Sequence, residues 1–184
     1  AVKNGNIKRV RELLDLGADP NITDNNLGDT ALILACRGSA WRPGGNQPRI
    51  DIVELLLDHG ADPNIRGYIG STALIEASEE DHAEILRLLL DRGADPNIRG
   101  LNRDSYDDTA LNIVSQRGNI EMVRLLLYRG ADPNIQDGVG MTSLIRASEN
   151  GHTEIVRLLL DRGANPNIRD EYGMTALIFA SWNG

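Results

Sequence analysis

The sequence predicts an all-α repeat protein, a solenoid of stacked helix-turn-helix units, because two short motifs recur in step along the chain. The motif GA(D/N)PNI recurs at intervals of 43, 33, 37 and 33 residues and starts at Gly17, Gly60, Gly93, Gly130 and Gly163. The motif T(A/S)L recurs at intervals of 42, 37, 33 and 33 residues and starts at Thr30, Thr72, Thr109, Thr142 and Thr175. Two independent motifs therefore share a period of 33 residues, which indicates one structural unit written several times.

Composition favours thin layers of small helices. Only 4% of the 184 residues are aromatic while 41% are hydrophobic, so Leu, Ile, Val and Ala must fill the interior. The formal charge of −8 argues against a nucleic-acid partner, because such binding depends on Lys and Arg that neutralise phosphates. No apolar run approaches the roughly 18 residues of a membrane-spanning helix. Cys36 is the only cysteine, which excludes an internal disulfide and a cysteine-built metal site. We expect a soluble, intracellular, cytoplasmic protein without a membrane partner.

Each T(A/S)L motif is expected to begin the first helix of a unit. The threonine hydroxyl can accept a hydrogen bond from a backbone N–H of the first turn, and a short apolar face follows, as in TALIEAS from Thr72. A polar break such as ENGH separates it from a second helix with three- and four-residue apolar spacing, as in TEIVRLLLDRG. Gly ends that helix and ADPN turns the chain into an extended finger. Helices this short need packing between neighbouring units to be stable.

Two units are longer than the others. Thr30 lies 30 residues before Gly60, against 21 in three other units, and the surplus falls in a Gly- and Pro-containing loop insert at about 38–49. Gly93 lies 16 residues before Thr109 instead of 12, which predicts a longer finger at about 100–107. We predict a single domain over residues 1–184 with four full repeats and a half repeat at each end. The units are approximately 1–24, 25–66, 67–103, 104–136, 137–169 and 170–184.

These features resemble the ankyrin repeat, with its 33-residue period, T-P-L-H-x-A motif and two helices that follow a turn. The resemblance covers nearly the whole chain and is clearest in GMTSLIRASENGHTEIVRLLLDRGANPN, which starts at Gly140. The usual Pro after Thr is Ala or Ser here, and the usual His is Ile33, Ile75, Asn112, Ile145 or Ile178. The resemblance therefore implies that His-centred hydrogen bonds between repeats are lost and mostly replaced by apolar packing.

The two ends carry incomplete units. Phe179 and Trp182 lie near an end whose first helix has no second helix after it. We expect a monomer, with end-to-end association through the open terminal repeats or a longer parent array as alternatives.

No residue set predicts catalysis. Ser, His and Asp all occur, but no pattern suggests that they converge. His82 and His152 share one slot in two repeats and are expected to make structural hydrogen bonds, while His59 precedes a helix-ending glycine, where a cation is favourable. Cys36 is expected to be a small core residue. We predict a protein that is not an enzyme, with no catalytic residue and no cofactor.

An acidic cluster in the longer finger raises the question of a metal. Asp104, Asp107 and Asp108 lack the spacing and central Gly of a calcium loop. A solvated loop is the preferred interpretation, and no metal is predicted.

The resemblance implies a protein-binding groove formed by the fingers and the exposed face of the first helices. The residues carried over as partner-binding are Arg66, Tyr68, Ile69, Glu76, Arg99, Tyr106, Asp108, Gln116, Met141, Arg146, Arg169, Tyr172 and Met174. Tyr and Arg are enriched in binding hot spots. The alternatives are that the tyrosines pack on their own fingers and that the arginines pair with nearby carboxylates. Trp41, in the insert, either anchors its loop or contacts a partner.

The predicted function is a non-enzymatic scaffold that binds a protein partner of unknown identity through this groove. One alternative is a structural spacer without a groove ligand, whose mark is finger residues wholly used in internal pairs. The other is a targeting segment of a longer enzyme or effector.

Overall fold

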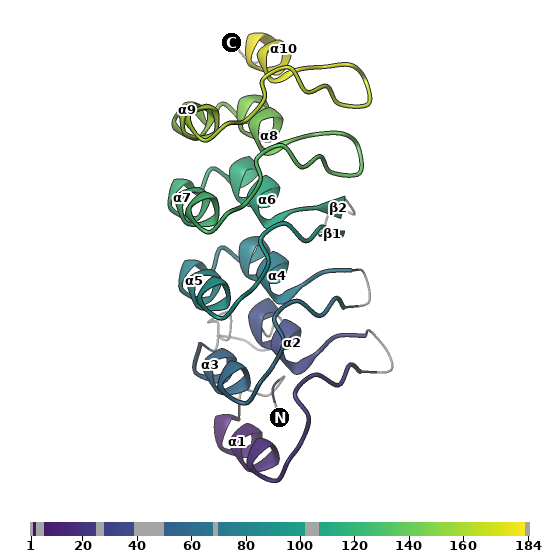
Figure 1. Ribbon diagram of the computed structural model, residues 1–184, viewed down its shortest axis with the longest axis vertical. Helices are drawn as coiled ribbons and strands as arrows, with labels where there is room; N and C mark the ends of the chain where they lie inside the picture. The colour runs from purple at the N-terminus through teal and green to yellow at the C-terminus, as the bar shows by residue number, and fades with distance from the viewer. Residues whose placement is uncertain are drawn as a thin grey trace. The chain divides into compact units, whose positions relative to one another are not determined.

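The computed structural model describes residues 2, 6–24, 28–38, 50–67, 70–101 and 107–182. Within these ranges the chain forms ten α-helices and one pair of two-residue strands (Figure 1). The helices are α1 (Ile7–Asp15), α2 (Ala31–Arg37), α3 (Ile50–Asp58), α4 (Ala73–Glu79), α5 (Ala83–Asp91), α6 (Ala110–Arg117), α7 (Ile120–Tyr128), α8 (Ser143–Glu149), α9 (Thr153–Asp161) and α10 (Ala176–Trp182). The strands are β1 (Gly100–Leu101) and β2 (Asp107–Asp108). The predicted all-α repeat fold is confirmed.

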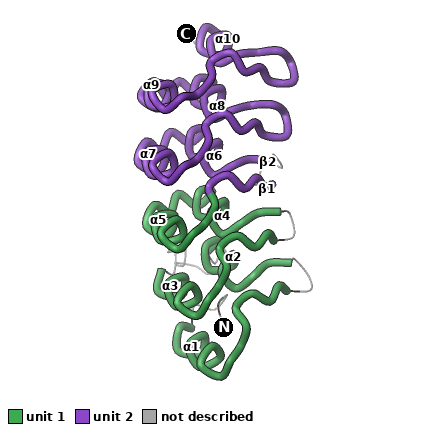
Figure 2. Tube along the Cα trace, viewed as in Figure 1, with its two compact units in different colours: residues 1–95 green, residues 96–184 purple. Residues whose placement is uncertain are grey.

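The chain divides into two compact units, residues 1–95 and residues 96–184, drawn in two colours in Figure 2. In unit 1, α2 packs beside α4 as one layer, and α1, α3 and α5 pack in sequence as the other. In unit 2, α6, α8 and α10 form one layer, and α7 and α9 form the other. The first helices α2, α4, α6 and α8 also pack on the second helices of their own repeats, α3, α5, α7 and α9. Both units are therefore stacks of helical pairs, as the motif spacing predicted.

The first helix of each pair begins directly after the predicted threonine. Thr30, Thr72, Thr109 and Thr142 all have extended backbones. Each hydroxyl accepts a hydrogen bond from the N–H three residues later, at distances between 3.2 and 3.4 Å. These bonds satisfy one of the N–H groups that a helix start leaves without an intrahelical partner. The threonine-cap prediction is confirmed at these four positions.

The second helices end on a left-handed glycine. After α9, Gly163 has φ +86°, and the following Ala164 N–H returns to the carbonyl of Leu159 at 3.0 Å. A Cβ built on Gly163 would meet nothing within 4 Å. The backbone conformation, and not a lack of space, therefore requires glycine here.

Asparagine side chains join the turns of neighbouring repeats. In unit 1, Asn64 Nδ2 donates to the carbonyl of Gly93 at 3.0 Å, and Asn64 Oδ1 accepts from the N–H of Asp95 at 2.8 Å. In unit 2, Asn134 donates in the same way to the carbonyl of Gly163 at 3.2 Å. The Asn of each ADPN turn thus holds the next repeat, which gives this part of the motif a structural reason.

Aliphatic side chains fill the core, as the composition predicted. The largest fully buried side chains are Leu32, Ile33, Ile52, Leu56, Leu74, Ile75, Ile85, Leu86, Leu89, Leu111, Met122 and Leu126. Burial of one such side chain contributes about 1.5–3 kcal/mol. The layers are thin enough that no large aromatic residue is needed between them.

The structure describes both sides of the longer finger but almost none of the insert. The finger predicted at about 100–107 begins with β1, which pairs antiparallel with β2 in the register Gly100 to Asp108 and Leu101 to Asp107. The insert predicted at about 38–49, including Trp41, lies outside the described residues apart from Gly38.

Candidate functional site

The predicted partner-binding residues fall into groups that differ in exposure. The exposed ones are Arg66, Arg99, Arg169 and Tyr172. The half-buried ones are Gln116 and Met174. The buried ones are Glu76, Asp108, Met141 and Arg146. Tyr68, Ile69 and Tyr106 lie outside the described residues.

Tyr172 stands on a finger whose backbone is fixed by an aspartate. Asp170 Oδ1 accepts from the N–H of Tyr172 at 3.0 Å and from the N–H of Met174 at 2.7 Å. The N–H of Asp170 donates to the carbonyl of Met174 at 3.0 Å, which closes the same turn. The Tyr172 side chain is nevertheless 80% exposed. A large aromatic surface is therefore presented from an ordered turn.

The arginine register of the fingers is used inside unit 2. Arg99 Nη1 donates to the carbonyl of Gln136 at 2.9 Å, and Arg99 Nη2 pairs with Asp107 Oδ2 at 2.6 Å. In the same register, Gln136 Nε2 donates to the carbonyl of Arg169 at 3.0 Å. This register thus links each finger to the next one. In unit 1, Arg66 Nε donates to the carbonyl of Gly70 of its own finger at 3.3 Å.

Glu76 belongs to an ionic bridge between the two first helices of unit 1. Arg37 Nη2 and Nε donate to the Glu76 carboxylate at 2.8 and 3.0 Å, and Arg37 Nη1 donates to Asp29 Oδ2 at 2.6 Å. Ser71 Oγ donates to Glu76 Oε1 at 2.9 Å. The hydrogen bond to Glu76, opposed by burial, raises the pKa of Arg37, so this guanidinium stays charged. Glu76 therefore joins neighbouring repeats, and its side chain is mostly buried in this bridge.

Arg146 makes a buried ion pair in unit 2. Its Nη2 binds Asp137 Oδ2, and the two side chains are only 6% and 0% exposed. Asp137 Oδ1 accepts from the N–H of Val139 at 2.9 Å and from the N–H of Met141 at 2.8 Å. Arg146 thus braces the finger that packs over its own helix. Arg146 and Met141 are in the predicted register, and both are buried.

Asn112 makes polar contacts at a slot where the family usually has His. Its Nδ2 donates to Asp108 Oδ1 at 3.2 Å and lies 3.5 Å from the carbonyl oxygen of Met141, while Ser143 Oγ donates to Asn112 Oδ1 at 2.6 Å. Asp108, also in the predicted register, is fully buried and accepts from this amide. Apolar packing was expected at these slots. It holds at buried Ile33, Ile75 and Ile145, but Asn112 restores hydrogen bonds between repeats.

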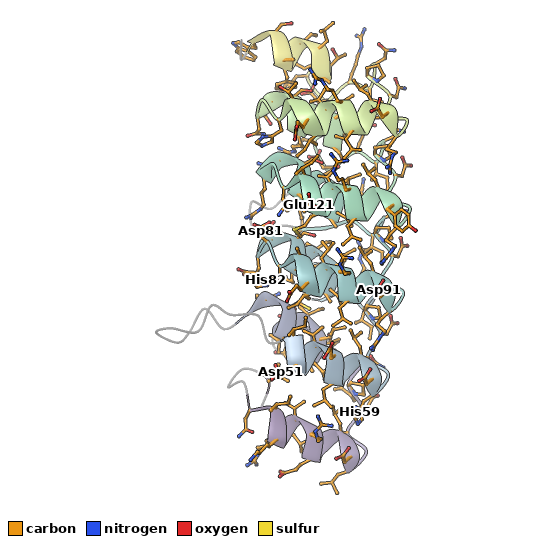
Figure 3. All side chains as sticks on the ribbon, turned by 90° about the vertical axis from the view of Figure 1, so that its left-hand side faces the viewer. Asp51, His59, Asp81, His82, Asp91 and Glu121 are labelled. Carbon is orange, nitrogen blue, oxygen red and sulfur yellow. The ribbon has the colours of Figure 1, made fainter. Side chains whose placement is uncertain are left out.

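His82 and His152 make structural contacts, as predicted, and His59 bonds with the backbone of its own helix. His152 Nε2 bonds with the carbonyl of Gln116 at 3.0 Å, and the ring packs against Gly118. His82, labelled in Figure 3, is the N-cap residue of α5, and a hydrogen bond to the backbone of Cys36 acts on its pKa. Burial lowers the pKa of His82 below its ordinary value of 6.5, against the opposing effects of this bond and of Asp81. His59 Nδ1 bonds with the carbonyl of Leu55 at 2.8 Å.

Cys36 is completely buried on α2, as expected of a core residue. Burial, assisted by repulsion from Glu76, raises the pKa of its thiol far above the ordinary range. The thiolate, which is the reactive form, is therefore disfavoured at this position.

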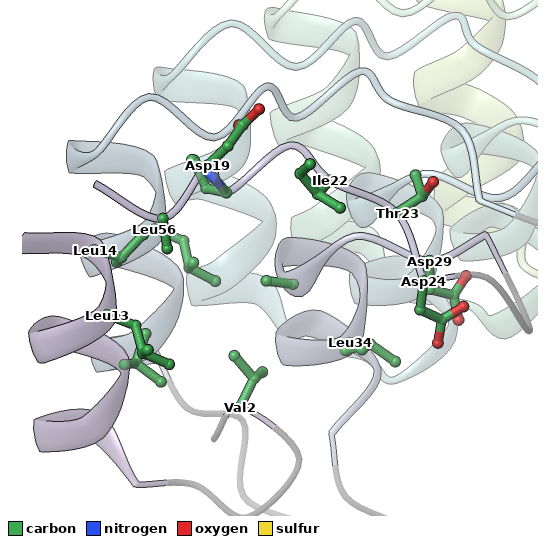
Figure 4. Close-up of a pocket in the computed structure, with 14 residues that line it drawn as sticks. Val2, Leu13, Leu14, Asp19, Ile22, Thr23, Asp24, Asp29, Leu34 and Leu56 are labelled. Atoms are coloured by element: carbon green, nitrogen blue, oxygen red, sulfur yellow. The ribbon is translucent and has the colours of Figure 1, made fainter. Parts of the chain in front are cut away.

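A cavity of about 460 Å³ lies in unit 1 between α1 and α2 (Figure 4). Its lining is mainly aliphatic and includes Val10, Leu13, Leu14, Ile22 and Leu34. An aliphatic lining suits packing by an apolar chain more than chemistry on a polar ligand.

Two further findings concern the described residues as a whole. The described residues contain no cluster of three or more His, Cys, Asp or Glu placed to hold a metal ion. Among the same residues, no helix has the length and apolar character required to cross a membrane.

Comparison with known families identifies the class of protein. The family described as ankyrin repeats (3 copies) matches residues 1–100, 48–137 and 111–184. Because these matches together span the whole chain, it belongs to the ankyrin repeat family, whose repeats are protein-interaction modules and generally non-enzymatic.

Curated relatives share part of this chain. It is 42% identical over 77 residues to the 2-5A-dependent ribonuclease of Mus musculus, which covers 42% of this chain and 9% of the relative. It is 38% identical over 73 residues to a putative ankyrin repeat-containing protein of Treponema pallidum, and the match covers 40% of this chain and 21% of the relative. It is 41% identical over 64 residues to the cyclin-dependent kinase 4 inhibitor B of Homo sapiens, and the match covers 35% of this chain and 38% of the relative. The chain thus spans less than half the length of these relatives.

Two exposed aromatic residues were not among the predicted contacts. Tyr128, at the end of α7, is 78% exposed, and Trp182, at the end of α10, is 76% exposed. Tyr128 had a signal in the sequence, because RLLLYRG replaces the RLLLDRG of two other repeats. Trp182 stands in the same helix position as Gln116 and Glu149 of earlier repeats.

Proposed function

We propose that this chain binds a partner protein through the fingers and first helices of its repeats. The proposed surface on unit 2 consists of Arg169, Tyr172 and Met174 on one finger, together with Gln116 and Glu149 on first helices. We call it the groove surface. The observation that carries the proposal is the 80% exposure of Tyr172 on a turn that Asp170 holds with two hydrogen bonds.

A preformed surface supports binding because little conformational entropy is lost on association. Tyr172 adds apolar area and a hydroxyl, and tyrosine is a common hot-spot residue. A typical interface of this kind buries roughly 800 Å² on each partner. Curated relatives that include a cyclin-dependent kinase 4 inhibitor support a protein as the ligand, since that name describes action on another protein.

The spacer alternative predicts finger residues wholly used in internal contacts. Arg99 and Gln136 fit that description, because both link neighbouring fingers. Tyr172 favours binding, because its ring is mostly exposed although its backbone is held. The groove surface is therefore preferred over the spacer function.

We also propose that residues 1–184 act as one repeat domain, as a monomer and in the cytoplasm. The ankyrin family match along the whole chain supports the single domain, and the buried single cysteine suits a reducing compartment. Light scattering across a concentration series tests the monomer, and a rise in mass with concentration contradicts it.

The test begins with a partner selected by affinity capture and confirmed by titration with purified protein. Tyr172→Ala is expected to weaken that partner by at least about 1 kcal/mol, or about fivefold in Kd. Tyr106→Ala, at the equivalent sequence position of the longer finger, is expected to act in the same direction. Leu16→Ala is the matched control, because Leu16 is 85% exposed but lies at the end of a second helix. Unchanged affinity in both tyrosine variants, with native circular dichroism, contradicts the groove surface.

A further inference from the structure

The ends of the second helices carry a regular column of charges. The last residue of each second helix is Asp15, Asp58, Asp91, Tyr128 or Asp161. The C-cap residue after it is Leu16, His59, Arg92, Arg129 or Arg162. We call these two rows the helix-end column. Four of the five last residues are carboxylates and one is a tyrosine.

In unit 1 the C-cap residues Arg92 and His59 each contact the aspartate that ends the preceding second helix. Arg92 Nη1 pairs with Asp58 Oδ1 at 2.7 Å. His59, labelled in Figure 3, places Nε2 at 3.4 Å from Asp15 Oδ1. In unit 1 the helix-end column thus forms polar contacts from one repeat to the next, and the contact between Arg92 and Asp58 is an ion pair.

In unit 2 this column changes chemistry. The C-cap of α9 is Arg162, and the residue at the end of the preceding helix α7 is Tyr128 instead of an aspartate. Within the described part of the chain, the Arg162 guanidinium makes no ion pair. Tyr128 is 78% exposed, and Arg129 lies with its guanidinium carbon 5.9 Å from the centre of the Tyr128 ring. An exposed aromatic ring beside Arg129 therefore takes the position that an aspartate holds at the ends of the other second helices.

A second replacement removes another carboxylate nearby. The turn after α9 has Asn165 where the four earlier turns have aspartate. Asn165 Oδ1 still accepts from the N–H of Asn167 at 3.0 Å, as Asp132 Oδ1 accepts from the N–H of Asn134 at 2.9 Å. The hydrogen bond is kept and only the charge is lost.

These replacements give the two units different local charge. At positions 58, 59, 62, 91, 92 and 95 of unit 1, four aspartates and one arginine give −3 with His neutral. At the equivalent positions 128, 129, 132, 161, 162 and 165 of unit 2, two aspartates and two arginines give zero. In a chain of net charge −8, this part of unit 2 therefore repels an acidic segment less than the equivalent part of unit 1 does.

We propose that Tyr128, Arg129 and Arg162 form a second recognition surface, on the turns that end α7 and α9, for a protein segment in which an acidic side chain neighbours an apolar one. The guanidinium of Arg162 offers a planar pair of donors that suits a carboxylate. The ring of Tyr128 offers an apolar face to the neighbouring side chain, and Tyr and Arg are enriched in binding hot spots. A cation at the end of α9 is favourable to the helix itself, but that does not account for an exposed ring in place of the column carboxylate.

The test uses a fluorescein-labelled peptide with three Glu-Leu pairs spaced by Gly and Ser, and a second peptide with Gln in place of Glu. The wild-type chain is expected to bind the Glu peptide at least about fivefold more tightly than the Gln peptide, and more weakly as salt is raised. Tyr128→Asp, which restores the column carboxylate, and Arg162→Gln are each expected to weaken the Glu peptide at least about fivefold. Amide chemical shifts are expected to change at residues 128–132 and 161–165.

Arg92→Gln is the matched control, because it removes the equivalent arginine of unit 1, which already pairs with Asp58. Its affinity for the Glu peptide is expected to equal that of the wild type. Thermal unfolding of each variant verifies the fold. Equal affinity of wild type and Tyr128→Asp, equal affinity of the two peptides, or no saturable binding below about 1 mM overturns the proposal. Such a result leaves the groove surface untouched, because that surface lies on other elements.

Discussion

Replacing Arg146 by leucine is expected to destabilise unit 2, because it removes one partner of a buried ion pair. The Asp137 side chain is 0% exposed, and its Oδ2 faces the Arg146 guanidinium. Loss of one partner from such a pair typically costs about 3–5 kcal/mol. Asp137 Oδ1 keeps its bonds to the N–H groups of Val139 and Met141, so we expect the lower value of about 3 kcal/mol. For a chain of this size, that corresponds to a fall in Tm of about 6–12 °C.

The assay is urea unfolding followed by circular dichroism, on a double-mutant cycle of Arg146→Leu and Asp137→Asn. Asparagine keeps the Oδ1 acceptor but removes the charge. The double variant is therefore expected to be more stable than Arg146→Leu alone by at least about 1 kcal/mol. Arg157→Leu, an exposed arginine of α9, is the matched control and is expected to change stability by no more than about 0.5 kcal/mol.

One result refutes this reasoning directly. Suppose that the free energy of unfolding of Arg146→Leu lies within about 1 kcal/mol of that of the wild type, and that the variant also binds a partner of the groove surface more weakly. Arg146 is then available to a partner. The ion pair between Arg146 and Asp137 then contributes little to stability, and Arg146 remains a predicted partner contact.

Two further predictions concern histidines. Burial lowers the pKa of His82 below 6.5, so as the pH falls His82 is protonated in the unfolded chain before it is protonated in the folded chain. The contribution of neutral His82 to the free energy of unfolding is therefore fully present above about pH 6.5 and is lost as the pH drops below that value. His82→Gln is expected to reduce that fall, which urea unfolding between pH 7.5 and 5 measures, and an unchanged slope contradicts it. Gly118→Ala is expected to cost at least about 2 kcal/mol, because the position has φ +81° and the new Cβ would lie 2.5 Å from the His152 ring. Gly163→Ala, with similar φ but open space around it, is expected to cost only about 1–2 kcal/mol, and equal losses in the two variants contradict the His152 contact.

Local chemistry made the helix boundaries predictable. A threonine hydroxyl reaches an N–H only three residues away, so the T(A/S)L motif identified helix starts that the structure confirms at Thr30, Thr72, Thr109 and Thr142. The apolar spacing of the second helices is also a local property. The slot shared by His82 and His152 was predictable for the same reason, because it repeats with the motif.

The candidate site was less predictable, because exposure depends on parts of the chain far from each residue. Glu76 is in the predicted register, but Arg37, 39 residues earlier, covers its carboxylate. Arg146 is likewise in register, but the finger that carries Asp137 folds over it. Tyr172 is the one predicted tyrosine within the described residues, and its 80% exposure keeps it in the proposal.

Differences between the repeat copies also indicated a candidate surface. Tyr128 and Asn165 each replace an aspartate of the common pattern, and both replacements can be read from the aligned copies. Their meaning required the ion pair between Arg92 and Asp58, which showed what the missing carboxylate does elsewhere.

By itself the sequence determined the period, the helix starts, the aliphatic interior and membership of a repeat class, since each depends on residues a few positions apart. Only the tertiary structure decided which polar side chains on the first helices stay exposed and which join the repeats. The physical reason is that charged side chains such as Arg37 and Arg146 are long enough to reach carboxylates on other elements. Whether they do so depends on how each finger folds back over its helices, and that arrangement is not encoded in any one repeat.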